Sequence, residues 1–154
     1  YGLTLHPDKT RLVPFRRPDR GNGSNGGSGT FDLLGFTHYW GLSRKGNWVV
    51  KCLTAKDRFS RTLRRIREWC RMHLHDDVRT QQRALARKLL GHYGYFGVTS
   101  NYRALARLFL ETKRIWRKWL SRRSQKGFVN WQAMARLLER FPLPKPRIVH
   151  RYGT

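Results

Sequence analysis

From Lys56 onward, the apolar residues of this chain recur at the three- and four-residue intervals of an α-helix. Phe59, Leu63, Ile66 and Cys70 form the first stripe of this kind. The same spacing, together with capping residues, predicts three more helices: one from about Val78 to Phe96, one from a cap at Ser100 or Asn101 to Leu120, and one after Asn130. Each helix has one apolar stripe, so we expect the stripes to pack together in a bundle.

The stripes also predict which side chains enter the core. They are Leu85, Leu89, Tyr93 and Phe96 in the second helix, Tyr102, Leu105, Phe109, Thr112, Trp116 and Leu120 in the third, and Trp131, Met134 and Leu138 in the fourth. The three prolines within residues 141–146 should end the last helix and hold the chain extended.

The first third of the chain has a different pattern, rich in β-branched and aromatic residues. It predicts strands at Thr10–Phe15, Phe31–Trp40 and Trp48–Leu53, with Phe36–Trp40 pairing with Trp48–Leu53 across a short turn. The segment Gly21–Gly29 contains a formal G-x-G-x-x-G. A nucleotide-binding loop of that type is followed by a helix, whereas here a strand follows, so we expect a flexible, solvated loop.

These patterns predict an α+β fold: a small antiparallel β segment followed by an α-helical bundle. We expect a β domain over residues 1–54, a helical domain over 55–146 and a basic tail over 147–154. The first residues, Tyr-Gly-Leu-Thr, are neither a signal peptide nor a natural start, so we expect the chain to begin inside a larger protein. The sequence holds no run of apolar residues long enough for a transmembrane helix.

The charge of the chain predicts a polyanionic partner. Lys and Arg number 33 against 9 Asp and Glu, a formal net charge of +24 that disfavours the compact state unless a polyanion relieves it. Most of the cations are arginines, whose planar guanidinium binds phosphate oxygens in pairs and stacks on bases. A membrane surface would require one helix with an apolar and a basic face, whereas these helices use their stripes for packing. We therefore expect nucleic acid.

The cations of the first and third helices are the candidate RNA-binding residues. Residues 56–71 contain seven cations and only two acids. This excess of positive charge is larger than a solvent-exposed helix face without a partner would be expected to have. The candidates are Lys56, Arg58, Arg61, Arg64, Arg65, Arg67 and Arg71, with Arg103, Arg107 and Arg114 on the third helix. Tyr93 and Tyr95 could stack on bases, but their helical spacing favours a place in the core.

We find no catalytic or metal-binding constellation in the sequence. Asp76 and Asp77 are adjacent carboxylates that could hold Mg²⁺, but they precede the second helix, where aspartate is a common N-cap. Cys52 and Cys70 make neither a disulfide framework nor a zinc site and are expected to be free thiols in a reducing cytosol. We expect no metal and no cofactor bound to this chain.

Several segments, in order, resemble a known family. The segment 2–13 with its Lys9-Thr10, the segment 31–36 with Leu34-Gly35-Phe36, the segment 89–98 with Asn101, Trp116 with 120–126, and Trp131 with 141–146 are similar to the end of the palm and to the thumb, or maturase X region, of group II intron reverse transcriptases/maturases. The similarity covers nearly the whole chain. It rests on the order and spacing of the motifs rather than on any one of them.

The resemblance implies a role for each region. Lys9 would approach the phosphates of an incoming nucleotide, and Leu34, Gly35 and Phe36 would form the primer grip. The helices from Lys56 onward would lie along a template–primer duplex and hold group II intron RNA, with target DNA as a further partner. The parent activity would be RNA-templated DNA synthesis and help in intron splicing, in the bacterial cytoplasm and associated with nucleic acid.

The resemblance also implies that this chain is a fragment. The family's Tyr-x-Asp-Asp box would lie before Tyr1, and no Cys/His-rich endonuclease segment is seen. Without those aspartates there is no two-metal site, so we expect the chain to be inactive alone, with Mg²⁺ bound only in the complete enzyme. Two alternatives stay open: a stand-alone basic RNA-binding structural protein, such as a ribosome-associated one, and an inactive remnant.

Overall fold

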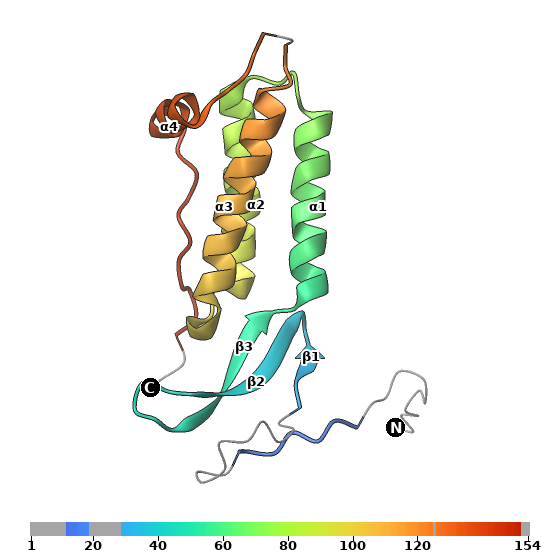
Figure 1. Cartoon of the computed structure of the whole chain (residues 1–154), viewed down its shortest axis with the longest axis vertical. Helices are drawn as coiled ribbons and strands as arrows, with labels where there is room; N and C mark the ends of the chain where they lie inside the picture. Colours follow the sequence, from blue (N-terminus) through green and yellow to red (C-terminus); the bar gives the residue numbers. More distant parts are fainter. Residues whose placement is uncertain (1–11, 19–28, 125, 152–154) are drawn as a thin grey trace. The chain divides into compact units, whose positions relative to one another are not determined.

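A computed structural model describes residues 12–18, 29–124 and 126–151. It has an α+β fold, with a three-stranded antiparallel sheet followed by four α-helices, and this confirms the predicted fold class. The chain divides into two compact units, residues 1–52 and residues 53–154. Figure 1 shows the elements of both units.

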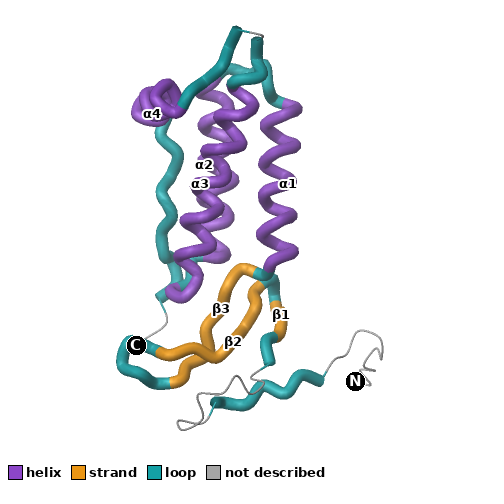
Figure 2. The backbone as a smooth tube through the Cα atoms, viewed as in Figure 1, coloured by secondary structure: helices purple, strands orange, loops and turns teal. Residues whose placement is uncertain are grey.

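The sheet has the strand order β1-β2-β3, with bounds Phe31–Leu33, Phe36–Leu42 and Trp48–Thr54 (Figure 2). The single strand predicted over 31–40 is in fact two strands, because Leu34 and Gly35 both have a positive φ, of 53° and 81°. Two successive residues of that kind form the tight turn that matches the twist of a β-hairpin. The predicted hairpin between β2 and β3 is confirmed, and its turn is closed by Ser43 N–H donating to Asn47 O at 2.7 Å.

The strand predicted at Thr10–Phe15 is not found in its described part, where residues 12–18 run without regular structure. Phe15 nevertheless packs on the sheet by its ring, edge-on to Phe31 at 4.9 Å and stacked on Trp40 at 5.4 Å between centroids. Aromatic packing rather than strand pairing therefore holds this segment. The predicted glycine loop lies outside the described residues apart from Gly29.

The helices of the second unit agree closely with the predicted positions. They are α1 (Lys56–Met72), α2 (Val78–Phe96), α3 (Tyr102–Leu120) and α4 (Trp131–Arg140), with a short 3-10 helix, η2 (Thr99–Asn101), before α3. Figure 1 shows α1, α2 and α3 running up, down and up within this unit. Among the described residues, none of these helices is long and apolar enough to cross a lipid bilayer.

Side chains cap the N-termini of α2 and α4, and the cap predicted before α2 is confirmed. The Asp77 carboxylate accepts the backbone N–H of Thr80 at 2.9 Å and so caps α2. The Asn130 side chain accepts the backbone N–H of Ala133 at 2.8 Å and caps α4. Each satisfies one of the backbone donors that the first turn of a helix leaves open.

The core of the second unit joins all four helices. Its fully buried side chains include Leu85, Leu89, Leu105, Trp116 and Met134, as the stripes predict. Two predictions were wrong: Tyr102 is 49% exposed and Trp131 is 50% exposed. Leu108 and Ile115 are buried in place of Tyr102, because the buried face of α3 lies slightly around the helix from the stripe we expected.

Asn101 does not cap α3 with its side chain, contrary to one of the two predicted caps. It is completely buried, and its Oδ1 accepts the backbone N–H of Thr54 at 2.8 Å. Its Nδ2 donates to Thr54 Oγ1 and to Phe96 O, each at 2.8 Å. A buried amide with these partners ties the start of the second unit to the junction between α2 and α3.

The proline segment after α4 is extended, as predicted, and returns along α2 (Figure 1). Gln82 Nε2 donates to Pro142 O at 2.6 Å, and the Tyr93 hydroxyl donates to Pro144 O at 3.1 Å. At its end, the backbone N–H groups of Val149 and His150 both donate to Gly97 O, at 2.7 and 2.8 Å. The final segment is thus fastened along the length of α2.

Candidate nucleic-acid interface

The seven cations of α1 are all exposed, but they do not form one surface. Arg58, Arg61 and Arg65 follow one another at intervals of three and four residues, and so do Arg64, Arg67 and Arg71. At 3.6 residues per turn, these two rows lie about a third of the helix circumference apart. Asp57 and Glu68 lie between the rows, and Lys56 lies beside the second row.

Ring contacts identify which neighbouring helix each row faces. Trp69 of α1 lies under the Lys88 ammonium of α2, 5.5 Å from its ring centroid. Arg65 stands one turn before Trp69, so its row lies on the α2 side of α1. The row of Arg64, Arg67 and Arg71 is on the other flank of the buried stripe. Helix α1 packs on α3, and Arg107 of α3 lies 5.2 Å from the centroid of the Phe59 ring in that stripe.

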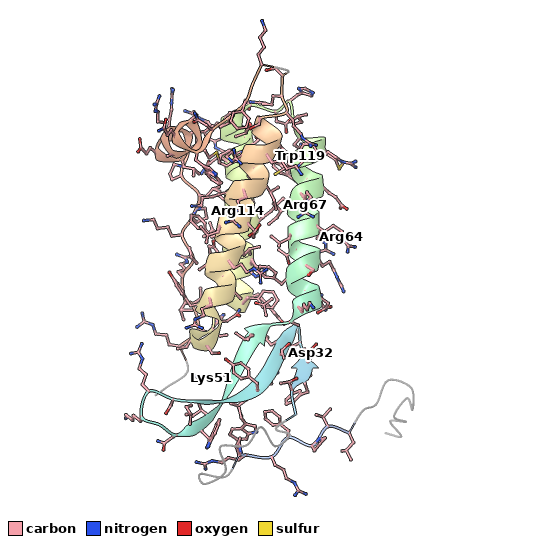
Figure 3. All side chains as sticks on the ribbon, in the orientation of Figure 1. Asp32, Lys51, Arg64, Arg67, Arg114 and Trp119 are labelled. Carbon is pink, nitrogen blue, oxygen red and sulfur yellow. The ribbon has the colours of Figure 1, made fainter. Side chains whose placement is uncertain are left out.

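A third row of cations lies on α3 beside the second row of α1. Arg103, Arg107, Arg114 and Lys118 are exposed and share one face of α3. Figure 3 labels Arg64 and Arg67 on α1 and Arg114 on α3. We call these two facing rows the α1–α3 surface: Lys56, Arg64, Arg67 and Arg71 with Arg103, Arg107, Arg114 and Lys118.

The α1–α3 surface holds much uncompensated positive charge. Among the residues that the structure describes, the ion pairs between arginine and a carboxylate are Arg61 with Asp57 at 3.2 Å and Arg114 with Glu111 at 2.7 Å. Both are exposed pairs between residues one turn apart, and such pairs contribute little to stability. Packed helices lie about 8–10 Å apart, so the two rows can contact phosphates along one groove of a nucleic acid.

The two tyrosines proposed for base stacking lie in different environments. Tyr93 is completely buried in the core, and burial raises the pKa of its hydroxyl well above its usual value. Tyr93 is therefore a core residue, as its helical spacing indicated, and the prediction that it contacts RNA was wrong. Tyr95, two residues on, is 53% exposed and packs edge-on against Phe96.

The residues assigned by resemblance to the primer grip belong to the first unit. Leu34 and Gly35 form the tight turn between β1 and β2, and Phe36 begins β2. Leu34 is 75% exposed at the tip of this turn. Lys9 lies outside the described residues.

The remaining chemistry-bearing groups have structural partners. Among the described residues, Asp76 belongs to no group of three or more His, Cys, Asp or Glu that could hold a metal ion. Its carboxylate lies 2.8 Å from His73 Nδ1. Cys70 is buried, and desolvation raises the pKa of its thiol to about 12, which suits a core residue rather than a nucleophile.

Several exposed cations of the bundle were not among the predicted RNA-binding residues. Lys118 extends the row on α3, and α2 carries Arg79, Arg83, Arg87 and Lys88. Their signal was present: the three arginines recur every four residues, and α2 contains no acidic residue. No protein-family model, curated protein or solved structure matches the chain.

Proposed function

We propose that this chain binds RNA through the α1–α3 surface, as part of a group II intron-encoded reverse transcriptase/maturase. The observation that carries the RNA-binding proposal is the pair of exposed cation rows on neighbouring helices, with few carboxylates to neutralise them. The family assignment is supported by the resemblance of the motifs and by their order along the chain.

On this proposal, the arginines position RNA by contacts to its backbone. Guanidinium groups contact pairs of phosphate oxygens, and such contacts fix the register of a duplex without reading its sequence. The turn at Leu34 and Gly35 would position the primer end, and the helical unit would hold the template–primer duplex or intron RNA, with target DNA as a further partner. The setting would be a nucleic-acid-associated one in the bacterial cytoplasm, and Mg²⁺ would be a cofactor of the complete enzyme.

The alternatives are a stand-alone basic RNA-binding structural protein and an inactive remnant. Both would keep the same fold, so the choice of RNA distinguishes them. A maturase fragment should prefer a group II intron RNA over an unrelated structured RNA of equal length. A general RNA-binding protein should bind both alike.

The test of the interface is the salt dependence of RNA binding. Each phosphate contact contributes about −0.7 to −0.9 to the slope of log affinity against log salt. The double variant Arg67→Gln/Arg107→Gln should therefore flatten the slope by about 1.5. The matched control is Arg136→Gln/Arg140→Gln, which removes the same charge from α4.

The measurement is fluorescence anisotropy of a labelled intron RNA over a salt series. We expect the control variant to keep the wild-type slope. Equal slopes for the wild type and the Arg67/Arg107 variant would reject the α1–α3 surface as the RNA contact.

A further inference from the structure

The proposed RNA surface leaves the other cation row of α1 without a function. Arg58, Arg61 and Arg65 lie on the flank of α1 that faces α2, separated from the α1–α3 surface by the line of Asp57 and Glu68. Because the two rows are about a third of a turn apart, an RNA lying along the α1–α3 surface does not reach this flank.

Helix α2 adds positive charge beside this flank. Lys88 reaches across to the Trp69 ring of α1, and the exposed Arg79, Arg83 and Arg87, at four-residue intervals, form a row on the outer face of α2, about a third of a turn or more around the helix from Lys88. No acidic residue lies within Val78–Phe96. We define the α1–α2 surface as Arg58, Arg61 and Arg65 of α1 with Arg83, Arg87 and Lys88 of α2.

The α1–α2 surface combines charge with aromatic rings. Trp69 is half-buried and stacks on His73 with 4.5 Å between centroids, under the Lys88 ammonium. Tyr95 is two turns beyond Lys88 on the same side of α2 and is half exposed. Arginines with accessible rings suit the phosphates and bases of RNA. An anionic membrane fits less well, because the apolar stripes of α1 and α2 are buried in the core.

We propose that the α1–α2 surface binds a second RNA segment, so that one helical unit bridges two RNA segments. This inference rests on the proposed function of the α1–α3 surface for the first segment. The two surfaces flank α1 on opposite sides of its line of acids, so each can hold its own duplex. Binding two segments to one rigid unit raises their effective concentration for each other. The helical unit would therefore promote RNA–RNA association.

The experiment uses two identical RNA duplexes, one with a donor and one with an acceptor fluorophore. Bridging gives energy transfer that rises with protein and falls again when protein exceeds RNA, because each duplex then binds its own protein. Anisotropy with one labelled duplex measures single-RNA binding separately. Sedimentation of the protein alone, and of the bridged complex, measures whether the bridging species contains one protein or two.

The test variant is Arg65→Gln/Arg87→Gln/Lys88→Gln, and the control Lys126→Gln/Arg136→Gln/Arg140→Gln removes the same charge elsewhere. We expect the test variant to lose bridging by about tenfold or more while single-duplex binding changes by less than about threefold, because its lost phosphate contacts belong to the second site. The control should bridge like the wild type. If the triple variant melts early, Arg65→Gln and Arg87→Gln are compared singly.

Three results would overturn the inference: bridging by the test variant at the wild-type level, bridging that needs a protein dimer, or no energy transfer with wild-type protein at any ratio. If the wild-type protein does not bind even a single duplex, the proposed function itself is contradicted. The two failures are therefore distinguishable.

Discussion

Replacing Asn101 by alanine should destabilise the helical unit more than any polar substitution on its surface. The Asn101 amide makes three hydrogen bonds of 2.8 Å, to Thr54 N, Thr54 Oγ1 and Phe96 O, in a site without solvent access. Each bond contributes about 0.5–1.5 kcal/mol, and an alanine removes the acceptor of the buried Thr54 N–H, while Phe96 O keeps the Val98 N–H as a donor. We therefore expect the free energy of unfolding to fall by about 3 kcal/mol.

Urea denaturation followed by circular dichroism measures this loss. With a slope of about 2 kcal/mol per molar urea, the midpoint should fall by about 1.5 M while the slope stays the same. The control Asn130→Ala removes an exposed cap and should cost only about 1 kcal/mol. Thr54→Val, which removes one of the three bonds, should fall between the wild type and Asn101→Ala. A loss for Asn101→Ala no greater than that for Asn130→Ala would refute the reasoning.

Three further predictions concern α2. Gly97→Ala should lower the urea midpoint, because a Cβ there would lie 2.2 Å from Tyr93 O. The Cβ in Gly94→Ala meets nothing within 4 Å, so this variant should raise the midpoint, because the higher helix propensity of alanine adds about 0.5–1 kcal/mol to the free energy of unfolding. Burial lowers the pKa of His92 to about 4, so the folded state binds fewer protons than the unfolded state between about pH 6.5 and 4. The free energy of unfolding should therefore fall as the pH drops through this range. His92→Phe should remove that part of the pH profile of stability, and an unchanged profile would contradict the prediction. The hydrogen bonds from Thr80 lower the pKa of the Asp77 carboxyl, so the contribution of Asp77 to stability is present at neutral pH and is lost as the pH falls through that lowered pKa. Asp77→Ala should therefore destabilise the protein at pH 7 and not at pH 2. Thermal melts at the two pH values measure this difference.

The local elements of this fold could be predicted because their signals are local. The bounds of α2 follow from the cap at Asp77 and from the glycine after Phe96. The hairpin of β2 and β3 follows from a short turn between two β-rich runs. Tyr93 and Tyr95 were the proposed RNA contacts whose spacing favoured the core, and the structure places Tyr93 there but leaves Tyr95 half exposed.

The long-range contacts could not be predicted in this way. Asn101 was a plausible cap by its position, but its amide bonds Thr54, which is 47 residues away in the chain. Gln81 likewise joins the loop after α1 to α3, donating to His73 O and accepting from Trp116 Nε1, each at 2.7 Å. Periodicity gives the face of a helix but not its neighbour, so the division of the α1 cations into two surfaces also required the structure.

The beginning and the end of the helical unit are both fastened at the junction between α2 and α3. Thr54 is bonded to Asn101, and the backbone of Val149 and His150 is bonded to Gly97. A unit that the chain enters and leaves at one place can be inserted into a loop of another protein without forcing the host's two ends apart. It could also tolerate circular permutation, with new ends in the segment between α3 and α4 and the old ends joined by a short linker. The helical unit could in this way be placed, with its cationic surfaces, in a protein of a different fold.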